Sequence, residues 1–405
     1  MTRRSMLFLF CLLLVLLTIA PAPAQQLSTA QRPKLNAYTT VSPARDVNGK
    51  KLSPADASAN SLLTTFTYNV VSSRDGNSYT GVMVGQDPFG GNFTPTTVTS
   101  PIIPLIITTN SVAVRLSSGG ILATAKGVTT FDPTAADTAC LSAPNDIPLA
   151  LFRQSPIFQP ANFKFGPTFV GKTQYIDAFQ RGNFWQLVSG TNYHTLVSPQ
   201  TFNALSLNLA ANDALAIPPG FLGSCGSLGI VNINTLGPIL VNLLALEGVK
   251  TSQFPIFLLY NVVMSIGEPN NLNKCCVLGF HGATGSPIQT FSPIDFDTTG
   301  LFGPTIADTS IAAHEVGEWM DDPFGNNPTP PWGHTGQVAG CQGNLENGDP
   351  LTGTNIPPVK GSNGFTYHLQ ELVFFSWFYG APSIAVNGWF SDNNTFTSDA
   401  GPVCQ

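Results

Sequence analysis

One short segment constrains this chain more than any other part of its sequence. Residues 312–323 read AAHEVGEWMDDP. The sequence predicts a helix from about residue 309 to residue 320, because Pro323 disfavours helical geometry in the residue before it. Side chains four residues apart on a helix lie one turn apart on the same face, so His314 and Glu318 can both reach one cation.

Glu315 lies about 100° further around this helix, where a catalytic base for a metal-bound water can stand. The arrangement is that of the HExxH helix of zinc peptidases, with Glu318 in place of the second histidine. A carboxylate is an accepted zinc ligand and also hardens the site, so we expect zinc, with Mn²⁺ or Ca²⁺ as alternatives.

The alternative is an amphipathic helix that shows its acidic groups to water. Such a helix usually pairs them with Lys or Arg, and none lies nearby in the sequence. Gly317 costs helix stability and therefore indicates close packing or the close approach of another element. These features favour a metal site.

A cation site needs a third protein ligand, and four residues are candidates. Glu346 and Asp349 lie in the turn-rich segment 340–350. His281 ends an apolar run before the helix, and His334 lies in a loop that can fold back. We rank these residues in the order Glu346, Asp349, His281 and His334.

Glu371 lies in the apolar segment 365–379 and would need a partner if buried. It can support a metal-bound histidine from behind, or it can stand at the edge of a core element. The second role is favoured.

The remaining sequence predicts an α+β protein. Short apolar and β-branched runs separated by turns between residues 61 and 130 predict a β-rich sandwich or barrel. Apolar runs at 254–264, 275–281 and 288–296, followed by the acidic helix, predict a zincin-like part with a mixed sheet and an active-site helix. The expected divisions are a signal peptide at 1–24, a flexible leader at 25–60, a β-rich domain at 61–165 and a zincin-like metal-site domain at 166–405.

The N-terminus predicts export. Two arginines, an apolar run over 6–19 and small residues before position 25 form a secretory signal, so we expect a secreted protein, extracellular or periplasmic. No second long apolar segment follows, so no membrane span is expected after cleavage. The six cysteines that remain predict disulfides of undetermined pairing.

Charge limits the partners. Only 10% of residues are charged, and the chain from residue 182 onward contains three basic and 15 acidic residues. No basic patch of the kind that binds nucleic acid is visible. We expect an extracellular peptide or polymer as substrate.

The segment 275–349 resembles a group of secreted microbial proteins with an HExxE helix. The resemblance rests on CVLGFH at 276–281, AHEVGE at 313–318 followed by DP, Trp332, and ENGD at 346–349. A weaker likeness links the chain to phosphate-induced, Exordium-like extracellular proteins. The resemblance implies a zincin-like domain without implying a substrate.

Three alternative functions are compatible with these sequence features. The first is a zincin-like metallopeptidase, in which Glu315 takes a proton from a metal-bound water and the strand at 275–281 offers an edge for the substrate. The second is an extracellular binding protein with a structural metal, and the third is a degenerate scaffold without metal.

Overall fold

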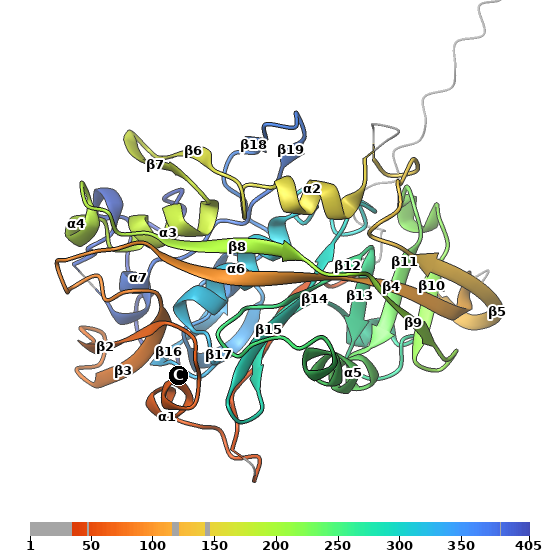
Figure 1. Ribbon diagram of the computed structural model, residues 1–405, viewed down its shortest axis with the longest axis horizontal. Coiled ribbons are helices and arrows are strands. Elements are labelled where there is room, and N and C mark those ends of the chain that lie inside the picture. The colour runs from red at the N-terminus through yellow and green to blue at the C-terminus, as the bar shows by residue number, and fades with distance from the viewer. Residues whose placement is uncertain (1–34, 47, 116–120, 142–145, 381) are drawn as a thin grey trace, which may run out of the picture. The chain divides into compact units, whose positions relative to one another are not determined.

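The computed structural model describes residues 35–46, 48–115, 121–141, 146–380 and 382–405 (Figure 1). The predicted signal peptide at 1–24 lies outside these residues. The chain from Lys34 to Gln405 forms one compact unit. Among the described residues, no helix combines the length and the apolar character needed to cross a membrane.

Seven strands close into a barrel. Their order is β14, β13, β11, β10, β4, β12 and β15, and β15 pairs back onto β14. The pairs β10–β11, β13–β14 and β14–β15 are antiparallel and the other four are parallel. The barrel strands are β4 (Thr96–Arg115), β10 (Ala214–Ile217), β11 (Leu228–Asn232), β12 (Ile256–Tyr260), β13 (Val262–Ser265), β14 (Cys275–Thr284) and β15 (Gln289–Phe296).

The long strand β4 extends this sheet beyond the barrel (Figure 1). It also pairs with β5 (Ile121–Phe131), β8 (Thr195–Thr201) and β9 (Leu205–Leu209). Strands from both sides of residue 165 therefore share one sheet. Within the predicted leader, β1 (Tyr38–Ser42) pairs in parallel with β14, and α1 spans Pro54–Ala59.

The predicted fold class is wrong. The protein is mostly β, with 38% strand and 19% helix, and a closed barrel stands where a zincin-like α+β part was expected. The apolar run at 254–264 is two barrel strands, which turn at Asn261 with a positive φ of 52°. Hydrophobic periodicity identifies strands but does not say which strands pair, and pairing decides the class.

The predicted helix is present as α6 (Ser310–Asp321), which contacts β14 and β15 and is buried along its whole length. Alternate residues of β12 belong to different apolar clusters: Ile256 and Leu258 join the cluster that includes α6, whereas Phe257 and Leu259 join the one that includes α5. The sheet is therefore covered on both faces. The other helices are α2 (Pro148–Gln154), α3 (Tyr175–Asn183), α4 (Trp185–Val188), α5 (Ile233–Leu246) and α7 (Phe375–Tyr379).

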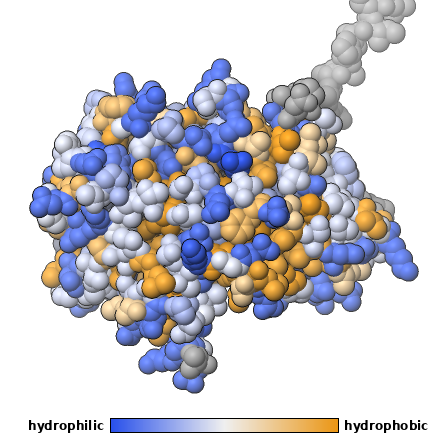
Figure 2. Space-filling view, viewed as in Figure 1, coloured by the Kyte–Doolittle hydropathy of each residue, from blue (hydrophilic) through white to orange (hydrophobic). Residues whose placement is uncertain are grey.

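Outside this sheet, the described residues form four separate two-stranded sheets, and one of them, β16–β17, leads directly into the segment that holds Glu346 and Asp349. These sheets are β2 (Thr65–Val71) with β3 (Ser78–Val84), β6 (Ala161–Phe165) with β7 (Thr168–Thr173), β16 (Pro328–Thr335) with β17 (Val338–Asn344), and β18 (Val359–Lys360) with β19 (Thr366–Tyr367). Figure 2 shows apolar residues gathered over α5, where Leu246 is 77% exposed.

The six cysteines among the described residues form three disulfides. The pairs are Cys140–Cys225, Cys275–Cys276 and Cys341–Cys404. Disulfides persist in oxidising compartments, so the pairing is compatible with an extracellular protein.

Candidate metal centre

The structure brings the predicted site residues together from three parts of the chain. His314, Glu315 and Glu318 project from α6, and His281 lies near the end of β14. Glu346 and Asp349 follow β17, and Asp349 begins a short 3-10 turn, Asp349–Leu351. All six residues are buried.

One group of three ligands consists of His314, Glu318 and Asp349. His314 Nε2 lies 2.9 Å from Glu318 Oε1 and 3.4 Å from Asp349 Oδ1. Two ligands of a tetrahedral zinc, each about 2.1 Å from the ion, are about 3.4 Å apart. The donor atoms therefore have the spacing that a small cation requires.

Gln370 fixes the orientation of the His314 ring. Its Oε1 lies 3.0 Å from His314 Nδ1, and its Nε2 donates to the carbonyl of Gly348 at 2.6 Å. An amide oxygen only accepts, so Nδ1 carries a proton and Nε2 faces the carboxylates. Gly348 allows this packing, because a Cβ there would lie 2.6 Å from the ring.

A second group consists of His281, Glu318 and Glu346. His281 Nδ1 lies 3.5 Å from Glu318 Oε2 and also 3.5 Å from Glu315 Oε2, and its Nε2 lies 3.9 Å from Glu346 Oε2. Nε2 also lies 3.1 Å from the backbone carbonyl of Asp322, to which it donates. Nδ1 is the nitrogen that faces Glu315 and Glu318.

Several buried atoms in the cluster have no hydrogen-bond partner. They are His281 Nδ1 and both carboxylate oxygens of Glu315. Among the ion pairs of the described residues, none joins a Lys or Arg to Glu315, Glu318, Glu346 or Asp349. Buried charges are normally paired or bound to metal, and among the described residues the charged partners of these carboxylates are the two histidines.

The pKa values of the cluster residues reflect their burial and their closeness to one another. Burial lowers the pKa of His281, but Glu315 and Glu318 outweigh burial and raise it to about 10. Burial raises the pKa of Glu315 to about 7, although the nearby histidines oppose the shift. Burial also raises the pKa of Glu318, but His314 and His281 outweigh it and hold that pKa well below its ordinary value. Without a cation, the two histidines hold protons that a metal would displace.

Access to the cluster is narrow. A pocket of about 240 Å³ between β1 and β17 reaches Glu346 and Asp349. At its base the hydroxyl of Thr39 lies 2.7 Å from His314 Nε2 and 3.4 Å from Asp349 Oδ1. The strand at 275–281 is no free edge, because β14 pairs with β1, β13 and β15. The cluster is therefore reached through this pocket and not from an open sheet edge.

Two further predicted residues lie elsewhere. His334 is exposed beside Cys341 and Cys404, whose sulfurs are joined in a disulfide, so this trio is no cation site. Glu371 supports no histidine. It accepts hydrogen bonds from the backbone of Asn393 and Thr395 and from the Thr395 hydroxyl, which fits the favoured structural role.

Sequence reasoning missed the residues that orient the cluster. Gln370, Thr39, Gln337 and Gln342 are uncharged and far apart in the sequence. Gln337 and Gln342 both donate to Asp349, and Gln337 also bonds the backbone of Thr39. The one signal available was the position of Gln370 beside Glu371, in a segment already singled out.

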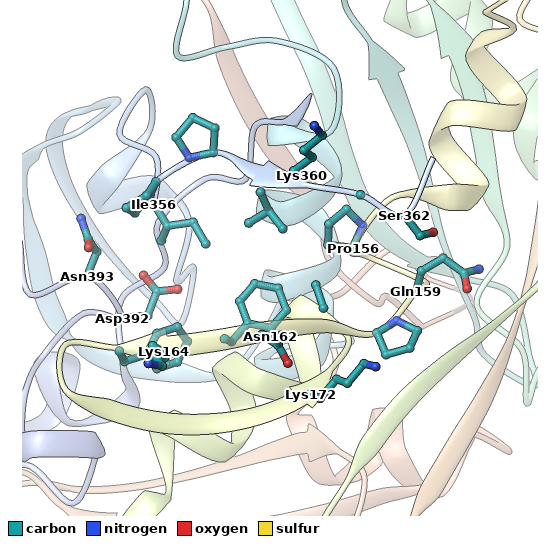
Figure 3. Close-up of a pocket in the computed structure, with 18 of the residues that line it drawn as sticks. Pro156, Gln159, Asn162, Lys164, Lys172, Ile356, Lys360, Ser362, Asp392 and Asn393 are labelled. Atoms are coloured by element: carbon teal, nitrogen blue, oxygen red, sulfur yellow. The ribbon is translucent and has the colours of Figure 1, made fainter. Parts of the chain in front are cut away.

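A larger pocket of about 630 Å³ lies elsewhere, between the β6–β7 hairpin and the segment 356–362 (Figure 3). Its labelled residues include Lys164, Lys172 and Lys360. None of the six cluster residues lines it. Volume therefore does not mark the place where the chemistry is concentrated.

Comparison of the chain with protein-family models, with curated proteins and with solved structures finds no match. The chemistry of the cluster must be argued from its own residues.

Proposed function

We propose that the chain is a secreted metal-dependent hydrolase that acts on an extracellular peptide or polymer. The observation that carries the proposal is the buried group of His314, Glu318 and Asp349. Its histidine is oriented from behind by an amide, as metal-bound histidines usually are. Zinc is the expected cation, with Mn²⁺ or Ca²⁺ as alternatives.

Each residue has a distinct role. His314 Nε2, Glu318 Oε1 and Asp349 hold the cation, which would polarise a scissile carbonyl and lower the pKa of a bound water. Glu315 takes the proton from that water. A pKa of about 7 lets its carboxylate accept a proton near neutral pH and release it afterwards.

Export is supported by the three disulfides and by the signal-like N-terminus. The reducing cytosol disfavours disulfide bonds. An extracellular location fits a hydrolase whose substrate is a peptide or polymer.

The second candidate function is that of an extracellular binding protein in which the cation only stabilises the structure. The observation in its favour is the closed surrounding of the cluster, where Thr39 lies against the ligand atom of His314. Structural sites are closed, whereas catalytic sites keep one position open for water or substrate. In that case, chelation would lower stability and no substrate would be turned over.

The first test is elemental analysis of the purified, dialysed protein. We expect at least one equivalent of metal, and less than about a tenth of an equivalent would refute both candidates. Glu315→Gln should then retain the metal and lose at least about 10²-fold in activity on a peptide panel. Glu268→Gln is the matched control, because Glu268 is exposed and outside the cluster. Equal activity of wild type and Glu315→Gln would remove Glu315 as the base.

A further inference from the structure

Glu318 lies between the two histidines of the cluster and presents a different oxygen to each. Oε1 lies 2.9 Å from His314 Nε2, and Oε2 lies 3.5 Å from His281 Nδ1. Asp349 stands on the His314 side and Glu346 on the His281 side. The two candidate groups therefore share a single residue, Glu318.

Both histidines are prepared in the same way. The Nδ1–H of His314 donates to the Gln370 amide oxygen, and the Nε2–H of His281 donates to the Asp322 carbonyl. In each ring the remaining nitrogen faces carboxylates, and its lone pair becomes available when a metal displaces the proton. A neutral imidazole held from behind in this manner is the usual form of a metal ligand.

We infer that the cluster binds two divalent cations bridged by the carboxylate of Glu318. The first is held by His314, Glu318 Oε1 and Asp349. The second is held by His281 Nδ1 and Glu318 Oε2, with Glu346, which lies 3.9 Å from the other nitrogen of the His281 ring, as the third group. This inference rests on the proposed function for its first cation, and it adds a second cation and a bridging role.

The charge of the cluster supports two cations over one. Glu315, Glu318, Glu346 and Asp349 carry four negative charges when ionised, and none of them forms an ion pair with a Lys or Arg among the described residues. With both histidines neutral and all four carboxylates ionised, one divalent cation balances two of these charges and two cations balance all four. Uncompensated buried charge is strongly unfavourable.

An independent observation places the second cation beside His281. His281 Nδ1 and both oxygens of Glu315 are buried and have no hydrogen-bond partner, although they lie within 3.5 Å of one another at their nearest atoms. His281 and Glu315 are both fully buried, at 0% exposure. A cation at this position gives the nitrogen a partner and places a positive charge next to Glu315.

The pair of cations would clamp a substrate. In two-metal hydrolases the ions lie about 3.5–4 Å apart and stabilise both the attacking and the leaving oxygen. Glu315 touches the His281 side of the cluster, so it can receive the proton of a water held between the ions. The pocket that reaches Glu346 and Asp349 opens onto both groups.

The test is the stoichiometry of Zn²⁺ bound to the full secreted chain, measured by elemental analysis and by native mass spectrometry. We expect two equivalents for the wild type, one for His281→Asn and one for His314→Asn. His334→Asn is the matched control and should keep two, because His334 is exposed and its φ of 55° is one that Asn tolerates. Glu318→Gln should lose most of both ions.

A second measurement needs no variant and so remains decisive if the variants misfold. Anomalous diffraction from zinc-soaked crystals of the wild type should show two peaks on either side of Glu318. A single peak, or one equivalent in the wild type, overturns the bridged pair even if the protein hydrolyses peptides. Two equivalents without any hydrolysis would support the pair and refute the proposed function instead.

Discussion

Gln370 is the residue whose replacement tests the metal centre most sharply. Gln370→Met keeps the length of the side chain and removes its amide. Two buried groups then lose their partners, the Nδ1–H of His314 and the carbonyl of Gly348. Leaving a buried donor or acceptor unpaired costs about 1–3 kcal/mol, so the free energy of unfolding should fall by between about 2 and 6 kcal/mol.

Cation affinity should fall as well, because the His314 ring is no longer held with Nε2 toward the carboxylates. Loss of such a supporting contact typically weakens metal binding by about 10–100-fold, or about 1.4–2.7 kcal/mol. Competition with a chromophoric zinc chelator measures the affinity, and urea unfolding of the metal-free protein measures the stability separately.

The neighbouring residue supplies the control. Glu371→Gln disturbs only the hydrogen bonds to Asn393 and Thr395. It should lower stability and leave zinc affinity within about threefold of the wild type, since a factor of three is well below the 10–100-fold expected of a supporting residue. The reasoning is refuted if Gln370→Met binds zinc as tightly as the wild type, or if Glu371→Gln weakens binding more than Gln370→Met.

Three further outcomes are expected. Gly317→Ala should lower the melting temperature, because the new Cβ would lie 2.5 Å from Leu372 Cδ1 and 3.3 Å from Asn347 Oδ1, and overpacking of about 1–3 kcal/mol outweighs the gain of up to about 1 kcal/mol that Ala brings to a helix. An unchanged temperature would contradict the packing. The metal-free protein should melt lower at pH 8 than at pH 5. Burial raises the pKa of Asp321 and of Glu315 to about 7. The stability that their protonation contributes is therefore full below about pH 4 and is lost as the pH rises through 7. A higher melting temperature at pH 8 than at pH 5 would contradict this direction. Zinc at about 100 times its Kd should stabilise the protein by about 2.7 kcal/mol, and EDTA should reverse this gain. An unchanged melting temperature in calorimetry would argue against a specific zinc site.

The sequence predicted the helix well because its evidence is local. The spacing of His314 and Glu318 and the stop at Pro323 depend only on helical geometry, and α6 ends two residues before that proline. Gly317 also met the expectation of close approach, since a Cβ added there would lie 2.5 Å from Leu372 Cδ1 and 3.3 Å from Asn347 Oδ1.

The barrel could not be predicted in the same way. Its closure depends on the pairing of β14 with β15 and on the length of β4, which pairs with β8, β9, β5, β10 and β12 along 20 residues. The sequence divides this strand into two runs, 101–108 and 112–116, because Asn110 and Ser111 interrupt the apolar pattern. Asn110 donates to Asn208 of β9 and Ser111 donates to the carbonyl of Ala214 in β10, so the apparent break is a polar contact inside the sheet.

The error in fold class leaves the argument for the site intact, because fold and site rest on different evidence. A helix presents residues i, i+1 and i+4 in the same relative positions whether it packs on a zincin sheet or beside a barrel. What the fold adds is the second histidine: α6 packs on β14, and this contact brings His281 to Glu318. The glutamate that replaces the second histidine of HExxH therefore gains a role that a histidine could not take, because its two oxygens can face two cations and an imidazole offers one lone pair.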